Sequence, residues 1–478
     1  MHPHYYSYLI FWLLVTTILF KYGYCESSSL SSIGIGYQFT LPVVVGISSG
    51  RAYLMESSNE IKNEPNFKVA LSVEAIEEKF FCCLEVFLGD VKVWNSGHYT
   101  RFYMVDKCVL DFTQDGVLNL KGSKDTIGWT TATSGQGVQR LQILRTGNLV
   151  LVDGLNNIKW QSFNFPTDVM LWGQRLNVAT RLTSFPSNST SFYSLEIKNN
   201  KIGLYLNSGD SSYSYWEFKP SMNRNLTFMA LSSKGLELFN DQGKKIAQIR
   251  SRKYDPPLRF LALGNKTGNL GLYFYSPSKA QFEASFQALN TTCDLPLACK
   301  PYGICTFSNA CSCIRLLKEE EEEGVGSGCG EGFRGGFCGG GVGGKNEVDM
   351  VELEDVKSVL RDYDHDYRRG NNVSKTQCLE MCLDDCKCVG ASFYSQACFL
   401  YKLVGGLKQV DRGSGMSFLV KVPKGSTTSG THGKSNVKKW VVILVGVVDG
   451  MIILLVFGGV AYYLIRKKRN SHGDTPHN

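Results

Sequence analysis

The chain contains little histidine, with only seven in 478 residues. Between residues 26 and 439 there are three, His98, His365 and His432, and no two have the spacing of an H-E-x-x-H zinc site. This scarcity excludes zinc hydrolases of that type. No cofactor or metal site is expected.

Catalytic motifs are also few. Gly46-Ile47-Ser48-Ser49-Gly50 matches the G-x-S-x-G nucleophile motif, but no helical pattern follows it and no histidine can be assigned to it. The glycine-rich run at residues 324–344 lacks the strand and helix that flank a phosphate-binding loop. The chain is therefore predicted not to be an enzyme. An extracellular hydrolase remains a remote alternative, because paired glycosidase carboxylates have no set sequence spacing.

Excess positive charge is confined to the end of the chain. The formal net charge is +8, and from Lys421 onward nine Lys or Arg stand against two Asp, a net +7. The remainder is nearly neutral, which excludes the basic surface of a nucleic-acid-binding protein. We assign the positive charge to segments that flank a membrane, where it would face anionic lipid.

Two apolar segments predict a single-pass type I membrane protein. Residues 9–20 have signal-peptide length and suit cleavage after Cys25, although an uncleaved anchor is an alternative. Residues 440–465 would form a helix of about 39 Å, enough to cross a bilayer. Four basic residues then open a cytoplasmic tail at 466–478. The ectodomain is expected on the outer side of the plasma membrane.

The sixteen cysteines suit an oxidising compartment. Five N-x-S/T sequons lie between the two apolar segments, and N-glycosylation is expected at them: Asn188, Asn225, Asn265, Asn290 and Asn372. Cysteines and sequons therefore agree on an extracellular location.

The region from about residue 67 to residue 176 has the pattern of an all-β fold. Short apolar runs alternate with turn residues such as Asp115-Gly116 and Thr146-Gly147-Asn148, and no long helical periodicity is present. Turns at intervals of about ten residues predict a sandwich, barrel or prism.

Residues 144–176 (LRTGNLVLVDGLNNIKWQSFNFPTDVMLWGQRL) resemble the bulb-type lectin signature of the plant G-type, or S-domain, receptor family. The family segment W-Q-S-F-x-x-P-T-D is matched at 160–163 and 166–168. The sequence departs at Asn164 and Trp172, where the family commonly has Asp and Pro. The resemblance implies a three-sheet β-prism.

The same resemblance implies a mainly β chain with tandem bulb-lectin-like β-prism modules, small disulfide-rich EGF-like and PAN/apple modules, and one transmembrane helix. The expected boundaries are a signal peptide at 1–25, an N-terminal extension at 26–64, a bulb-type lectin domain at 65–178, a second S-domain-like β module at 179–290, an EGF-like region with an acidic and glycine-rich insert at 291–340, a PAN/apple domain at 345–424 and a stalk at 425–439. In most relatives an intracellular kinase follows. This chain resembles the kinase-less PAN-domain lectin receptor-like proteins.

Disulfide pairs are also implied by the resemblance: Cys293–Cys305, Cys299–Cys311, Cys313–Cys329, Cys378–Cys398 and Cys382–Cys388. Cys338 is an alternative partner for Cys313. The odd total leaves one thiol unpaired, among candidates that include Cys82, Cys83 and Cys108, and Cys338 and Cys386 also have no assigned partner.

Ser374 and Gln377 form a capping-box pattern that predicts the start of a short helix. Such a helix places Cys378 and Cys382 on one face, at i and i+4. Cysteines on one face can then be bridged to neighbouring strands.

Mannose-binding bulb lectins carry the motif Q-x-D-x-N-x-V-x-Y, whose polar groups contact sugar hydroxyls. Two segments can be aligned with it. They read Thr113, Asp115, Val117, Asn119, Lys121 and Leu144, Thr146, Asn148, Val150, Val152. The matches are Asp115 in the first segment and Asn148 and Val150 in the second, and these are the candidate ligand-binding residues. The alternative is that they serve only the fold, since a lectin fold does not guarantee sugar binding.

These features predict a cell-surface, receptor-like lectin-fold glycoprotein without a kinase, which recognises an extracellular carbohydrate or protein ligand. Asp449 lies inside a G-x-x-x-G pattern, Gly446 to Gly450, of the expected span. This face could bind the transmembrane helix of a receptor kinase or of a second copy. Alternatively, Asp449 is only a tolerated polar residue, and the chain is a passive cell-wall-contacting or decoy glycoprotein.

Overall fold

The computed structural model of the chain describes residues 31–43, 49–57, 64–76, 79–184, 191–220, 225–252, 256–314, 348–362, 370–423, 457–459 and 462. Within these ranges the protein is mainly β, with a ten-residue α-helix, helical residues at 457–459 and 462, and three short 3-10 helices. The 3-10 helices are η1 (Ser123–Asp125), η2 (Ser162–Asn164) and η3 (Thr292–Asp294).

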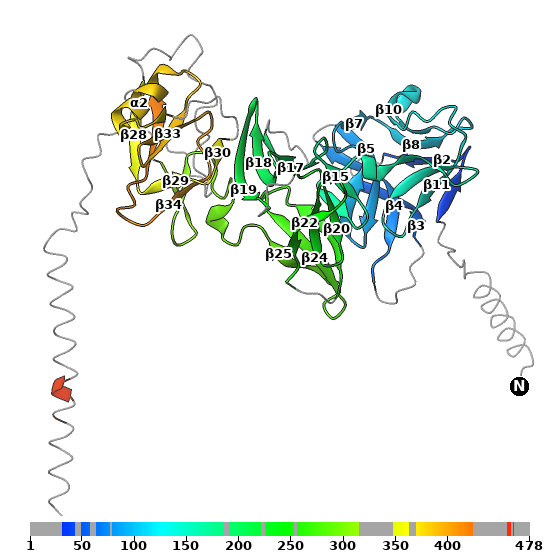
Figure 1. Cartoon of the computed structure of the whole chain (residues 1–478). Helices are drawn as coiled ribbons and strands as arrows, with labels where there is room; N and C mark the ends of the chain where they lie inside the picture. Colours follow the sequence, from blue (N-terminus) through cyan, green and yellow to red (C-terminus); the bar gives the residue numbers. More distant parts are fainter. Residues whose placement is uncertain are drawn as a thin grey trace, which may run out of the picture. The chain divides into compact units, whose positions relative to one another are not determined.

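The first module has three antiparallel sheets (Figure 1, blue to cyan-green). Sheet A has the order β1-β11-β12-β13, sheet B the order β2-β8-β9-β10, and sheet C the order β3-β4-β5-β6 with β7 paired to β5. Their strands are β1 (Ser32–Gly34), β2 (Gln38–Pro42), β3 (Ser49–Glu56), β4 (Phe67–Ile76), β5 (Lys79–Leu88), β6 (Val91–Asn95), β7 (Phe102–Met104), β8 (Lys107–Phe112), β9 (Leu118–Lys121), β10 (Ile127–Thr130), β11 (Val138–Ile143), β12 (Leu149–Asp153) and β13 (Ile158–Gln161).

Glycines close two of the hairpins. Gly116, between β8 and β9, has φ +85°, and Gly147, between β11 and β12, has φ +81°. A Cβ on Gly147 would lie 2.4 Å from Cε1 of Phe67. Glycine is therefore required there for both conformation and space. These turns set the strand register, because a slip of one residue would turn the apolar side chains outward.

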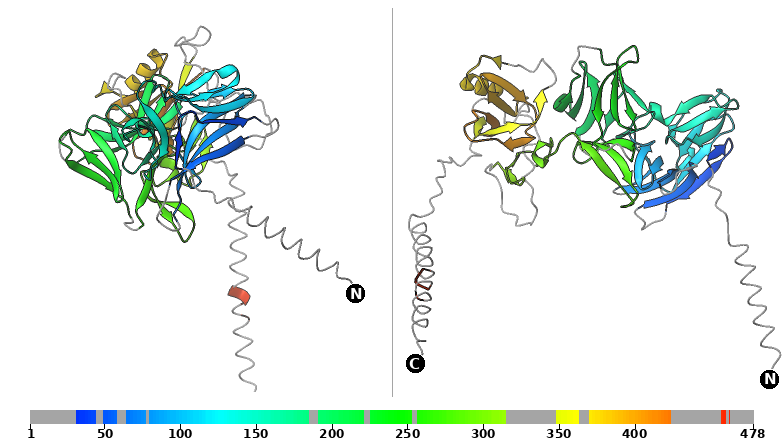
Figure 2. Two further views of the ribbon diagram at one scale, coloured as in Figure 1. Left: turned by 90° about the vertical axis from the view of Figure 1, so that its right-hand side faces the viewer. Right: turned by 60° about the horizontal axis from the view of Figure 1, so that its bottom comes forward.

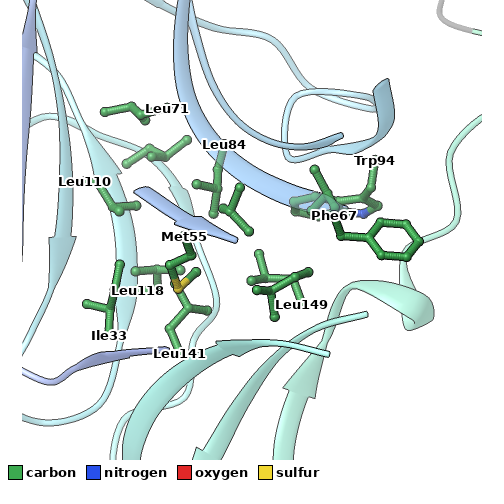
Figure 3. Packing of buried hydrophobic residues seen from close by; sticks show 14 of the residues in the cluster. Ile33, Met55, Phe67, Leu71, Leu84, Trp94, Leu110, Leu118, Leu141 and Leu149 are labelled. Carbon is green, nitrogen blue, oxygen red and sulfur yellow. The ribbon is translucent and has the colours of Figure 1, made fainter. Parts of the chain in front are cut away.

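One hydrophobic core is shared by the three sheets. Met55 of β3, Leu118 of β9 and Leu141 of β11 belong to it and come from sheets C, B and A (Figure 3). Their exposed fractions are 3%, 0% and 0%. Burial of each such side chain contributes about 1.5–3 kcal/mol to folding, so the core holds the three sheets together.

The N-terminal extension expected at residues 26–64 does not precede the first module but builds part of it. Ser32 pairs with Gln142 of sheet A, Phe39 with Leu110 of sheet B, and Ala52 with Leu71 of sheet C. The first three strands along the chain, β1, β2 and β3, therefore form one edge strand each of sheets A, B and C. The strands that follow complete the sheets in the reverse order: β4 to β7 complete sheet C, β8 to β10 sheet B, and β11 to β13 sheet A.

The second module repeats this plan with sheets D (β14-β23-β24-β25), E (β15-β20-β21-β22) and F (β16-β17-β18-β19-β30). Figure 2 shows these strands from two further directions, in green except for β30, which is yellow. They are β14 (Val169–Leu171), β15 (Arg175–Asn177), β16 (Leu182–Thr183), β17 (Ser191–Lys198), β18 (Lys201–Ser208), β19 (Ser211–Phe218), β20 (Phe228–Ser232), β21 (Gly235–Phe239), β22 (Lys245–Arg250), β23 (Leu258–Leu263), β24 (Leu270–Ser276), β25 (Gln281–Gln287) and β30 (Arg361–Asp362). The expected boundary at residue 178 is therefore too late, because β14 and β15 already pair with β23 and β20.

The remaining strands form two smaller sheets, with the orders β27-β26-β34-β29 and β28-β35-β32-β33-β31. Their bounds are β26 (Gly303–Cys305), β27 (Cys311–Cys313), β28 (Val348–Glu354), β29 (Val356–Ser358), β31 (Gly370–Asn371), β32 (Gly390–Tyr394), β33 (Ala397–Tyr401), β34 (Leu407–Gln409) and β35 (Ser417–Pro423). β26 pairs with β34 in parallel, so the expected EGF-like and PAN segments share a sheet.

The helix α2 (Lys375–Asp384) packs on the second of these sheets, and its predicted capping box is confirmed. Gln377 N donates to Ser374 Oγ at 3.2 Å, and Ser374 N donates to Gln377 Oε1 at 2.8 Å. Lys421, assigned from the sequence to a membrane-flanking segment, is instead buried in β35. Its Nζ donates to the backbone oxygen of Asp385 at 3.0 Å, because the end of a helix leaves carbonyls without partners.

Within the described ranges, no helix has the length and apolarity that a membrane crossing requires. The expected signal peptide, the stalk and nearly all of residues 440–465, Asp449 included, lie outside those ranges.

Candidate functional site

The Asp115 carboxylate is exposed in the turn between β8 and β9. Thr113 Oγ1 donates a hydrogen bond to one of its oxygens, and Ser134 Oγ donates to the other at 2.7 Å. These two donors lower the pKa of Asp115, so it is ionised at neutral pH. Both of its oxygens have partners within their own module.

Asn148 is buried, with an exposed fraction of 5%. Its Nδ2 donates to Gln161 Oε1 at 2.8 Å, while its Oδ1 accepts from Ser162 Oγ and from Phe163 N, both at 3.2 Å. The amide therefore joins the start of β12 to the W-Q-S-F segment. Val150, the third candidate, is fully buried, with an exposed fraction of 0%.

The strand register reveals a third copy of the motif position, in sheet C. Each sheet carries a tryptophan on its outer strand, and the residues paired with these tryptophans are Val86, Leu120 and Leu151. The residues directly before these three occupy the same place in the three copies, the Val position of the Q-x-D-x-N-x-V-x-Y motif: Glu85, Asn119 and Val150. Sequence reasoning missed the third copy because it retains no motif residue; the paired tryptophan is the signal that locates it.

A buried charge cluster occupies this third position. Glu85 is 1% exposed, and its carboxylate lies 2.5 Å from Lys92 Nζ and 3.7 Å from Arg51 Nε. Cys83, two residues earlier, is a buried thiol outside any disulfide. Burial first, and then the charge of Glu85, raise the pKa of Cys83 well above its ordinary value. The thiol is therefore protonated and a poor nucleophile.

A related spacing occurs in the second module. The residues Asn265, Thr267, Asn269, Gly271 and Tyr273 can be aligned with the motif and keep its Asn and Tyr. Asn269, Gly271 and Tyr273 help to line a pocket of about 270 Å³. Asn269 Nδ2 donates to Leu289 O at 2.8 Å, and its Oδ1 accepts from Leu289 N at 3.0 Å, so this amide also bonds internally.

The cysteine pairs of the described ranges are Cys82–Cys108, Cys293–Cys305, Cys299–Cys311, Cys378–Cys398 and Cys382–Cys388. Cys313 and Cys386 are disulfide-bonded as well. Cys329 and Cys338 lie outside the described ranges. Among the described cysteines, the bond between Cys82 and Cys108 leaves Cys83 as the thiol without a bridge, a choice that the sequence left open.

Four of the five sequon asparagines are exposed: Asn225, Asn265, Asn290 and Asn372. Asn188 lies outside the described ranges. Asn265 Nδ2 donates to Asp168 Oδ2 at 3.0 Å. A glycan on Asn265 would be attached to the same nitrogen.

Ser48 of the G-x-S-x-G match lies outside the described ranges, but β3 follows it directly, whereas a nucleophile elbow leads into a helix. Among the residues that the structure describes, no group of three or more His, Cys, Asp or Glu could hold a metal ion.

Comparison with known proteins places these features among lectins. The family model described as D-mannose binding lectin matches residues 93–191. A G-type lectin S-receptor-like serine/threonine-protein kinase of Arabidopsis thaliana is 25% identical over 79% of this chain and 46% of the kinase. A PAN domain-containing protein of the same plant is 26% identical over 60% of this chain and 58% of that protein.

A third relative, EP1-like glycoprotein 4 of Arabidopsis thaliana, is 29% identical over 70% of this chain and 79% of the glycoprotein. The chain spans about half the length of the first two relatives. The likeness to all three extends well beyond the segment that the family model matches.

Proposed function

Since the chain belongs to the plant G-type lectin receptor-like family, we propose that it is a cell-surface recognition protein whose lectin modules bind an extracellular carbohydrate. The EGF-like and PAN segments are proposed to hold these modules outside the plasma membrane. The expected span would anchor them, and a partner with a kinase domain would carry the signal inward.

The observation that carries the proposal is the complete three-sheet lectin module. All three sheets are present and share one core, so the scaffold for recognition is intact although the mannose motif is largely replaced. A preserved fold with altered motif residues fits a changed ligand, because function resides in sites carried by the fold.

A glycan array probed with the full-length protein tests recognition. We expect binding to at least one class of plant extracellular glycan. Proximity labelling of the same protein in its native membrane should identify a kinase-bearing neighbour. Failure to bind any glycan would contradict carbohydrate recognition, and absence of labelled kinases would contradict the signalling role.

A second candidate is a passive wall-contacting or decoy glycoprotein. It is favoured by the internal bonding of Asn148 and Asn269, which leaves their amides engaged within the fold. The likeness to EP1-like glycoprotein 4 over most of that protein also supports it. A passive anchor would have no kinase neighbour, so the labelling experiment separates the two candidates.

A further inference from the structure

Three tryptophans, one from each sheet of the first module, contact one another. Trp94 lies on β6, Trp129 on β10 and Trp160 on β13, each on the outer strand of its sheet. Their ring centroids are 5.8 to 6.3 Å apart, with interplanar angles of 67° to 83°. Edge-to-face contacts of this kind are favourable, so the three rings make a rigid aromatic base.

A pocket of about 210 Å³ opens over this base. At its rim, Phe165 stacks on Trp160 with centroids 5.7 Å apart and an interplanar angle of 21°. Phe165 is 47% exposed and Tyr99, also in the lining, is 57% exposed. Trp94 Nε1 donates to Phe165 O at 2.9 Å, and the Tyr99 hydroxyl donates to Pro166 O. These bonds hold the rim in place before any ligand arrives.

The pocket also contains an acceptor without a partner. Asn95 lines it and is only 8% exposed. Asn95 Oδ1 is buried and has no hydrogen-bond partner among the described residues. A buried polar atom left unbonded destabilises the fold. Such an atom on a residue that lines a pocket points to a donor that a ligand would bring.

We infer that this aromatic pocket binds one neutral pyranose ring of an extracellular glycan. The inference rests on the proposed function and names the place where recognition occurs. The apolar face of the ring would lie against the tryptophans and Phe165, and a ring hydroxyl would donate to Asn95 Oδ1. None of the residues that would contact mannose in the Q-x-D-x-N-x-V-x-Y motif lines this pocket.

The lining determines the class of ligand. It contains no charged side chain, which favours a neutral molecule over an acidic sugar. Its volume is below the roughly 300 Å³ at which pockets for drug-sized ligands begin, so it suits a single ring. Three hydroxyl-bearing residues, Ser96, Thr100 and Thr130, also line the pocket and favour a ring with several hydroxyls over a peptide side chain.

Two substitutions separate a binding role from a structural one. Phe165→Ala removes the exposed stacking face but keeps the backbone carbonyl that Trp94 uses. Asn95→Leu removes the unbonded acceptor at similar volume, so the variant should unfold at the same temperature as the wild type or higher. A residue needed only for the fold would instead lower that temperature. Trp172→Ala is the matched control, because Trp172 is 60% exposed in the same lectin signature and does not line the pocket.

The full-length protein in lipid nanodiscs is the sample, since free detergent could itself enter an apolar pocket. Responding glycans are identified on an array, and the methyl glycosides of glucose, galactose and xylose are then titrated while tryptophan fluorescence is followed. We expect a fluorescence change on binding, and affinities about tenfold weaker or worse for Phe165→Ala and Asn95→Leu. Trp172→Ala should bind as the wild type does.

Glycan binding at wild-type affinity by both pocket variants would overturn the inference and leave the proposed function standing. Binding of no glycan by the wild type would overturn both. Binding only of peptides or of aromatic compounds, lost in the pocket variants, would overturn the assignment to a sugar.

Discussion

At the scale of single residues, the amide and the carboxylate that remain of the Q-x-D-x-N-x-V-x-Y motif form hydrogen bonds within the protein. Asn148 uses both ends of its amide to join β12 to the segment after β13. Asp115 has a hydroxyl donor on each oxygen. A hexose at either place would have to replace these bonds, and the positions that should supply the other sugar contacts are occupied by Thr, Val, Lys and Leu.

We therefore expect no measurable binding of mannose at these positions. Titration of the full-length protein with methyl α-mannoside should give no saturable signal up to millimolar concentration. Millimolar or tighter binding that Asp115→Ala or Asn148→Ala abolishes would contradict this prediction. A bound sugar of another class would not, because it does not depend on the motif.

His98 is a buried titratable group, with an exposed fraction of 2%. Its Nε2 lies 2.9 Å from Thr183 Oγ1, and its ring meets Tyr99 edge to face at 4.9 Å. Burial lowers the pKa of His98 from 6.5 to about 4. Between these two values the unfolded chain binds a proton that the folded chain does not bind.

His98 should therefore make the free energy of unfolding fall as the pH drops from 6.5 to about 4, by about 3 kcal/mol at most. Urea unfolding at pH 7 and pH 4.5 measures this loss. His98→Gln should reduce the loss, while Tyr99→Phe, which keeps the histidine, should show the loss in full. Equal pH dependence in His98→Gln and the wild type would refute the assignment.

At the scale of elements, α2 shows how a short helix is held by its surroundings. Its capping box provides hydrogen-bond acceptors for backbone N–H groups at the start of the helix. Cys378 and Cys382 are both fully buried on the face toward the sheet. Cys378 is bridged to Cys398 of β33, and Cys382 to Cys388. The small core at this site consists largely of these sulfur atoms, so the bridges supply much of its stability.

Loss of one bridge should destabilise this module strongly. Cys378→Ser is expected to lower its free energy of unfolding by about 2–5 kcal/mol and to cause retention in the secretory pathway. Export measured by surface labelling checks this. Cys83→Ala is the matched control, because it removes a buried cysteine without removing a bridge. Normal export of Cys378→Ser would contradict the prediction.

At the scale of the whole molecule, signalling would depend on the expected span. Asp449 stands near the middle of residues 440–465, where insertion of a carboxylate costs about 2.5–3.5 kcal/mol. The neighbouring glycines, Gly446 and Gly450, would let a second helix approach closely enough for Asp449 to bond to it.

Asp449→Leu should then insert into membranes more efficiently while associating less with a partner helix. A membrane two-hybrid or crosslinking assay measures the association, and an insertion assay measures the first effect. Gly446→Ile should weaken association without removing the carboxylate. Unchanged association in both variants would show that this face binds no helix.

The sequence by itself determined the all-β character, the likeness to bulb lectins and the start of α2. These features depend on patterns of ten to thirty residues, such as the turn spacing, the W-Q-S-F segment and the Ser374–Gln377 pair. Local patterns of this kind can be recognised in a single sequence, because the residues that form each pattern are close together along the chain.

Only the tertiary structure decided which strands complete which sheet and which polar groups are already bonded. Ser32 pairs with Gln142, and Val169 pairs with Ala262, across separations that no local pattern records. For the same reason the three tryptophans and Asn95, spread over residues 94–160, become one pocket only in the fold. Edge strands and shared pockets are made by contacts between distant segments, and the free energy of those contacts exists only once the sheets have formed.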